Sequence, residues 1–463
     1  MGIQVNSIKF DHFVDEKNEL KSLAGTSKKS VTVIKIFYRT GSGWFVSAFL
    51  VVNATLGAGL LNLPVAYHQA GGVLSAVIVQ TVMLVFIVLT LLILGYCSDI
   101  KGSNTYQDVV LSLCGPKAQL ACAVCVSLFS FGLCITLLII IGDQWEIFFL
   151  KVAYDVYCKT NPFYMTRAFT ISATSIVFIL PLCFPKRIDF LRYASVVGVL
   201  GILYVVVLVT VRYFLPHDSP GTIATRPNSW VDVFLVVPEI CFSYQCHVSI
   251  IPVYSCMAKR NIKEFSKTVS LAMILCIITY TVTAALGYLQ FGNSITNDIL
   301  LSFNPTAEVM VAVVLVAVKT YTTYPITCFC GKAALDTVWK TLRKMTPEES
   351  FHREKTRRVI TTLVWFTLTL LFSIYIPNIG VVIQLLGALA AVFIFIFPGL
   401  CLLKITENRI DSCENQPKTV YLLKGMAIVL LIVGVFIFGL TLSQAVIQDI
   451  RGVVLDHSEF TCA

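Results

Sequence analysis

Polar residues and glycines interrupt an otherwise apolar segment at residues 51–64, VVNATLGAGLLNLP. This segment carries the amides Asn53 and Asn62, with Gly57 and Gly59 between them. Every backbone group in hydrocarbon needs a partner, so such a break indicates a helix lined by protein or water. Secondary transporters bind their cargo at breaks of this kind. The alternative is a small-residue surface for helix packing, which also favours glycine in membranes.

A second polar interruption lies further along the chain, at residues 238–247, PEICFSYQCH, and Thr320, Thr322 and Thr323 precede a proline in a later segment. Two interrupted helices in corresponding positions of two halves are typical of an inverted repeat with a site at the midplane. Hydroxyl and carbonyl oxygens suit a hard cation such as sodium. The N–H groups of a broken helix suit the anionic end of a small substrate. Each threonine, taken singly, is also explained by a hydrogen bond to its own helix.

Two charged residues, Glu239 and Lys319, lie near the centres of apolar segments. Charge at that depth is costly unless it is compensated. Both residues lie about ten to twelve positions from the start of their segments, so their depths agree. We therefore expect one ion pair between them, and either charge is a candidate coupling group. For Lys319 two alternatives remain, which are snorkelling of its long side chain and replacement of a bound cation by its amine.

Composition identifies the surrounding solvent as lipid. The chain has 463 residues, of which 57% are hydrophobic and 13% charged, and its mean hydropathy is +0.81. This is more apolar surface than a soluble domain can bury. Segments long enough to cross a ~30 Å hydrocarbon core predict an all-α polytopic membrane protein with about eleven spans, at 45–66, 71–97, 117–142, 168–185, 190–214, 229–257, 266–291, 307–331, 359–376, 380–403 and 421–446.

The distribution of basic residues predicts the orientation. With residues 1–44 in the cytosol, 28 of the 35 Lys and Arg residues fall on the inner side, which is a strong positive-inside bias. The net charge of +9 thus reflects membrane orientation and gives no reason to expect nucleic-acid binding. Residues 1–44 are expected to form a disordered cytosolic tail, residues 45–446 the transmembrane domain, and residues 447–463 a luminal or extracellular tail. Cys158 and Cys462 face the oxidising side, and whether they pair is left open.

The motifs resemble those of the solute carrier 38 family of sodium-coupled neutral amino acid transporters, within the amino acid/auxin permease group. The matching pieces cover nearly the whole membrane domain and are VVNATLGAGLLNLP, QAGGV, TYQDVV, LIIIGDQ, PEICFSYQCH, TYPITCFCGK and IFPGLCL. The resemblance implies a LeuT-like fold of five plus five inverted spans with an extra eleventh. Glu239 falls where the related transporters have an uncharged residue.

Site residues follow from the same resemblance. It implies that Asn53, Thr322 and Thr323 bind sodium, that Asn53, Gly57 and Gly59 receive the substrate, and that Tyr244 lies beside the substrate. No catalytic residue and no cofactor other than the coupling ion is expected, because the chain has no metal-ligand spacing, nucleophile elbow or phosphate loop.

We therefore expect a secondary transporter of neutral L-amino acids, by resemblance glutamine and asparagine, coupled to sodium and moving them from the lysosome to the cytosol. Its partners would be the amino acid, sodium and the lipid bilayer, with no nucleic acid. Proton coupling on the same fold and an amino-acid-sensing receptor are the alternatives. The lysosomal membrane is favoured over the plasma membrane by resemblance alone. The sequence fixes neither the preferred amino acid nor the oligomeric state.

Overall fold

The computed structural model describes residues 42–160, 162–185, 191–216, 221–345, 354–376, 378–412 and 417–450. Throughout these ranges the regular structure is helical, and strand pairing is limited to one isolated bridge between Ser42 and Met257. The all-α fold class is therefore confirmed. Almost all of the two predicted tails, and Cys462 with them, lies outside the described residues.

The helices match the predicted membrane segments. Within the described ranges nine helices are long and apolar enough to cross a membrane, and one bent pair adds a tenth span. The remaining predicted span, 168–185, corresponds to a shorter apolar helix over Arg167–Leu182, which contains a π-helical turn at Ser175–Ile179. The chain is thus a multi-pass membrane protein, whereas the five-plus-five repeat stays a prediction.

The long helices and the pieces of the broken ones have the following bounds, in chain order: α3 (Trp44–Thr55), α4 (Gly59–Gln69), α5 (Val73–Lys101), α7 (Pro116–Val152), α11 (Leu191–Phe214), α12 (Val237–Ser243), α13 (His247–Ser255), α14 (Ile262–Phe291), α15 (Ala307–Arg343), α17 (Glu354–Tyr375), α18 (Ile379–Ala391), α19 (Phe397–Ser412) and α20 (Lys418–Ile450). Shorter helices are α6 (Tyr106–Cys114), α8 (Tyr154–Thr160), α9 (Arg167–Thr174) and α10 (Leu180–Leu182).

The outer surface of this bundle is apolar. Leu74, Phe214 and Leu422 are each at least 70% exposed. Large apolar surfaces of this kind are rare on soluble monomers and are expected where side chains face lipid. The buried core is apolar as well, so the polar residues inside it mark the places where the helices depart from lipid-like sequence.

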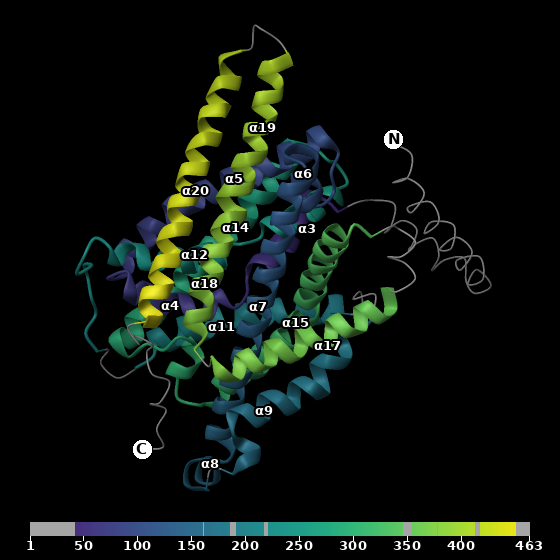
Figure 1. The fold of residues 1–463 in the computed structure, drawn as a ribbon. Helices are drawn as coiled ribbons and strands as arrows, with labels where there is room; N and C mark the ends of the chain where they lie inside the picture. The colour runs from purple at the N-terminus through teal and green to yellow at the C-terminus, as the bar shows by residue number, and fades with distance from the viewer. Residues whose placement is uncertain are drawn as a thin grey trace, which may run out of the picture.

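The broken helices lie at the centre of the packing. The two helices α3 and α4 are bent by 64° with respect to each other, and both pack against α14. Helix α12 packs against α4 and α18, while α15 packs along α7 and α11. Figure 1 shows α19 running beside α20. The two breaks are therefore enclosed by other helices, as a non-helical backbone in a membrane requires.

Close approach of α12 and α18 depends on one glycine. A Cβ atom built on Gly387 of α18 would lie 2.3 Å from the carbonyl oxygen of Pro238. Small residues at such contacts let membrane helices approach backbone to backbone. Gly387 therefore helps to hold α12, and with it the second break, in place.

Candidate functional site

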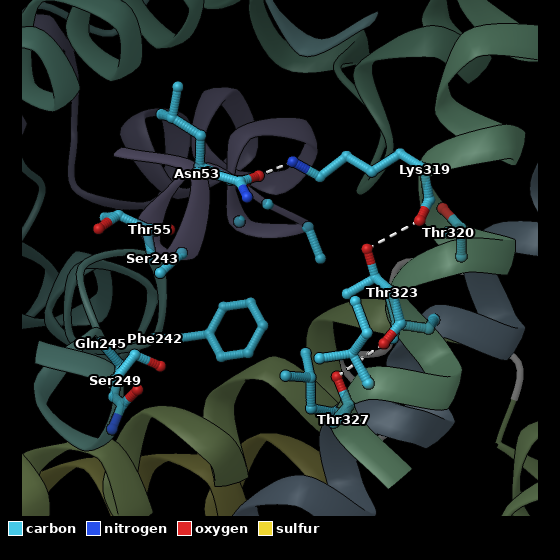
Figure 2. Close-up of a pocket in the computed structure, with 18 of the residues that line it drawn as sticks. Asn53, Thr55, Phe242, Ser243, Gln245, Ser249, Lys319, Thr320, Thr323 and Thr327 are labelled. Atoms are coloured by element: carbon cyan, nitrogen blue, oxygen red, sulfur yellow. Dashed lines mark hydrogen bonds between the residues drawn. The ribbon is translucent and has the colours of Figure 1, made fainter. Parts of the chain in front are cut away.

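A cavity of about 340 Å³ lies between the two broken helices and three unbroken ones. Helices α3, α4, α12 and α13 line one side, and α7, α11 and α15 line the other. Figure 2 shows the break after α3 facing α15 across this space, with the Phe242 ring pointing into it. The cavity volume falls at the small end of the range for ligand pockets, which suits a small molecule.

The first break opens the backbone of residues 56–58. Helix α3 closes with the Leu56 N–H donating to the Val52 carbonyl at 2.8 Å. Helix α4 begins again with the Leu60 N–H donating to the Gly57 carbonyl at 3.2 Å. The first N–H groups of a helix have no partner within it and carry a partial positive charge. Gly57 and Gly59 both line the cavity, so the start of α4 presents donors to an anionic group there.

The second break lies in the span formed by α12 and α13, over residues 244–246. Phe242, Ser243 and Gln245 line the cavity from this side. The Tyr280 hydroxyl of α14 lies 2.8 Å from the Thr55 carbonyl and 2.9 Å from the Ser243 carbonyl. One side chain thus contacts the last residue of α3 and the last residue of α12, and it connects the two breaks.

Close packing joins the two breaks as well. A Cβ atom on Gly59 would lie 2.0 Å from the Ser243 hydroxyl oxygen. Real Cβ atoms essentially never approach a neighbour that closely. Gly59 is therefore required for the contact between α4 and α12. A Cβ atom on Gly57, by contrast, would have the Thr55 carbonyl oxygen, at 3.9 Å, as its nearest neighbour.

Helix α15 supplies a row of hydroxyl groups to the opposite wall. Thr320, Thr323 and Thr327 line the cavity and recur at the spacing of one helix face. The Thr323 hydroxyl donates to the Lys319 carbonyl at 2.7 Å, and its oxygen can still accept or coordinate. Thr322 was also predicted to bind sodium, but it does not line the cavity, and its hydroxyl contacts the carbonyls of its own helix. A position two residues from Thr320 lies on another face of the helix.

Lys319 reaches across the cavity to the first break. Its ammonium nitrogen lies 2.5 Å from the Leu56 carbonyl oxygen, and Asn53 lines the cavity beside this contact (Figure 2). Lys319 is the only charged residue among those that line the cavity. A carbonyl left open by the break is thus satisfied by a cation that belongs to the protein.

The predicted ion pair between Glu239 and Lys319 is wrong. Glu239 is 3% exposed and accepts hydrogen bonds from the Asn62 amide at 2.6 Å and from the Ser243 hydroxyl at 3.2 Å. Lys319 instead donates to Leu56. The depths of the two residues agreed, but depth does not determine the direction in which each helix points its side chain. Each charge therefore has neutral partners of its own.

Tyr244 was predicted to lie beside the substrate, and it does not line the cavity. It is fully buried, and its hydroxyl accepts a hydrogen bond from the Gln80 amide at 2.8 Å. Its ring packs edge to face on Tyr280, with centroids 5.0 Å apart. The next residue, Gln245, faces the cavity instead, and a place for Tyr244 beside the substrate stays a prediction.

Sequence reasoning also missed the contribution of α7. Six residues of this helix line the cavity, which are Val126, Phe129, Ser130, Leu133, Leu137 and Ile140. Five of the six are apolar residues of a kind found throughout the chain, so no local pattern singled them out. Ser130 is the one hydroxyl residue among them, and the sequence did not distinguish it from Ser127 and Thr136, which lie in the same apolar stretch and do not line the cavity.

An ionic cluster lies one turn beyond the cavity on α7. Asp143, fully buried, pairs with Arg167 at 2.6 Å, and the Gln144 amide donates to Asp298 at 3.0 Å. Asp298 lies in the loop between α14 and α15. Burial, reinforced by the nearby Asp143 carboxylate, raises the pKa of Asp298 to about 8. On the predicted orientation this cluster lies on the outer side, where Cys158 is disulfide-bonded.

A second polar cluster lies at the opposite end of the broken helices. Asp99, near the end of α5, accepts from the Tyr254 hydroxyl at 2.6 Å and pairs with Arg260 at 3.3 Å. The Ser42 N–H donates to the carbonyl of Cys256 at 3.0 Å, and Cys256 lies between Tyr254 and Arg260 in the sequence. Polar contacts thus connect separate helices on both sides of the cavity.

The donor set does not resemble an enzyme site or a transition-metal centre. In the described part of the chain no group of three or more His, Cys, Asp or Glu residues could hold a metal ion. The cavity offers backbone donors, neutral hydroxyl and amide groups, and one ammonium. Such groups can bind a small polar molecule by hydrogen bonds. A broken-helix site enclosed by membrane spans is the arrangement found in secondary transporters.

Comparison with known proteins defines the family. Residues 40–447 match the family described as transmembrane amino acid transporter protein, and the chain belongs to it. It is 43% identical over 406 residues to sodium-coupled neutral amino acid transporter 7 of Homo sapiens, covering 87% of each chain. The protein of the same name from Danio rerio is 42% identical over 419 residues, or 89% of each chain. Solute carrier family 38 member 8 of Homo sapiens is 34% identical over 409 residues, 86% of this chain and 93% of that protein. The resemblance to the solute carrier 38 family is thereby confirmed.

Proposed function

We propose that the protein is a secondary active transporter of neutral L-amino acids, coupled to sodium, that works by alternating access. The cavity between the two breaks carries this proposal, because the start of α4 offers donors to an α-carboxylate. Sodium coupling is supported by the names of the similar transporters and by the oxygens of Asn53 and Thr323 in the cavity wall.

The lining favours a neutral side chain. Among the described residues no acidic side chain lines the cavity, so a cationic substrate side chain would find no counter-charge there and would meet Lys319. Asn53, Gln245, Ser130 and Ser249 provide amide and hydroxyl groups that can pair with a substrate amide. Glutamine and asparagine are therefore the substrates that we propose.

The test is uptake of labelled glutamine into proteoliposomes that contain the purified protein. Sodium and proton gradients are imposed separately at equal ionic strength, with protein-free liposomes as the control. We expect uptake that accumulates glutamine against its gradient when sodium is supplied. If only the proton gradient drives glutamine accumulation, the coupling ion is the proton and not sodium. Specific binding of glutamine without transport would favour an amino-acid sensor.

The proposed location is the lysosomal membrane, with transport from the lumen to the cytosol. This proposal rests on the family resemblance. Surface biotinylation of intact cells tests it, because a lysosomal protein should be captured only in a small fraction. Capture of most of the protein at the cell surface would assign it to the plasma membrane.

A further inference from the structure

Lys319 is a charged residue whose partner is a neutral backbone group. It lies on α15, a helix that is long and apolar enough to cross a membrane. In the described part of the chain it forms no ion pair, and its ammonium donates to the Leu56 carbonyl at 2.5 Å. A lysine at this depth needs compensation. The compensation comes from the oxygen of the helix break itself.

The same oxygen belongs to the region proposed for sodium. Leu56 is the first residue of the break, and Asn53, one turn earlier, lines the same cavity. Thr323, one turn after Lys319, lines the cavity on the other side of this contact. A hard cation takes carbonyl, amide and hydroxyl oxygens as ligands, and an ammonium group donates to the same oxygens.

We propose that the Lys319 ammonium and the transported sodium ion occupy this oxygen position in turn, so that Lys319 is a tethered competitor of sodium. The inference rests on the proposed function in taking sodium as the transported cation. Two positive charges at one carbonyl repel strongly in a site that excludes water. Sodium therefore binds only when the lysine has left, and the apparent affinity for sodium is reduced by the fraction of time for which the position is free.

The packing around Lys319 supports a replacement that removes only the charge. A Cβ atom on Gly198 of α11 would lie 2.9 Å from the Lys319 Cγ. Because Gly198 has no side chain, there is room beside it for the aliphatic part of the lysine. Methionine keeps an unbranched stem and lacks the ammonium, so Lys319→Met fills this room without the competitor. Lys319→Gln is a second neutral variant with a polar end.

The same helix provides a matched control. Lys332 is also buried on α15, and its ammonium donates to the Cys183 carbonyl at 2.9 Å and the Thr362 hydroxyl at 2.7 Å. It does not line the cavity. Lys332→Met therefore removes a buried lysine from the same element without touching the proposed cation position.

The experiment measures sodium binding directly and does not depend on transport. The thermal stability of the full-length purified protein is recorded against NaCl concentration, with choline chloride keeping ionic strength constant, because a ligand that binds the folded state raises the Tm. Glutamine uptake against sodium concentration is measured in parallel. If Lys319 holds the position for nine tenths of the time, Lys319→Met and Lys319→Gln should lower the half-saturating sodium concentration about tenfold. Lys332→Met should leave it unchanged.

The outcomes separate the two proposals. An unchanged or higher half-saturating sodium concentration in both folded Lys319 variants would overturn the competition. If sodium raises the Tm of a neutral Lys319 variant but not that of the wild type, the result would support the shared position. It would also count against sodium coupling in the native transport cycle. Wild-type protein that binds sodium without transporting any amino acid would count against the proposed function and would leave the comparison of sodium affinities intact.

Discussion

Replacing Gly59 with alanine should separate the two broken helices. The added Cβ atom would lie 2.0 Å from the Ser243 hydroxyl oxygen and 2.8 Å from the Ser243 Cβ. The hydroxyl can rotate away, but the Cβ cannot, so α4 and α12 must move apart by about 0.6 Å to reach an ordinary contact of 3.4 Å. Overpacking of this kind costs about 1–3 kcal/mol. At about 1.4 kcal/mol for each factor of ten, the ratio of folded to unfolded protein falls roughly 5- to 150-fold.

The matched control is Gly57→Ala, two residues away in the same break. Its Cβ would meet only the Thr55 carbonyl oxygen at 3.9 Å, and Gly57 does not have a positive φ. We expect Gly59→Ala to lower the Tm of the detergent-purified protein by about 1–3 °C, while Gly57→Ala leaves it within error. Adding Ser243→Gly to Gly59→Ala should recover part of the loss, because it removes the atoms that clash. Equal damage from both glycine variants would refute the packing argument.

The remaining predictions concern ions and charges. Asn53→Ala and Thr323→Ala should each raise the half-saturating sodium concentration for glutamine uptake by roughly tenfold at unchanged expression, because each removes an oxygen from the cavity wall. If sodium activates both variants as it does the wild type, the cation does not bind at these residues. Glu239→Gln and Lys319→Met have separate partners, so the losses of thermal stability in the single variants should add in the double variant within about 0.5 kcal/mol. Because the pKa of Asp298 is raised to about 8, this carboxyl stays protonated in the folded state at pH values where it is ionised in the unfolded chain. The free energy of unfolding should therefore fall as the pH rises from about 4 to about 8. Asp298→Asn removes this group, and a Tm that varies with pH as much as in the wild type would contradict the assignment.

Much of the fold could be predicted from the sequence because the bilayer imposes strong rules. Apolar length alone located a helix in each of the eleven predicted segments. The segment at 168–185 is one of the two shortest, and it is the one whose helix falls below the length of a full span. The break in the first span also followed from its residues, since Gly57 and Gly59 interrupt an apolar helix and the structure bends there by 64°.

The contents of the cavity were harder to predict because they depend on the direction of each side chain. Of the two threonines predicted to bind sodium, Thr323 lines the cavity and Thr322 does not. The helical period places Thr320 and Thr323 on one face and Thr322 on another, but it does not say which face points to the cavity. No such rule applies inside a break, where the backbone is irregular. Gln245 faces the cavity and Tyr244 is buried against Tyr280, and only the three-dimensional course of the chain distinguishes them.

The contacts around the cavity divide it into two unequal sides. The breaks on one side are joined to each other by the packing of Gly59 on Ser243 and by the Tyr280 hydroxyl, which has a single proton to share between two carbonyls. Across the cavity, the hydrogen bond from Lys319 to Leu56 is the one that connects α15 with the first break among the described residues. Alternating access in broken-helix transporters is largely the rocking of one bundle against another around a fixed site. The two breaks are thus hydrogen-bonded and packed to each other, and α15 is hydrogen-bonded to the first of them through one lysine. This is the division into two bodies that the proposed alternating access would use.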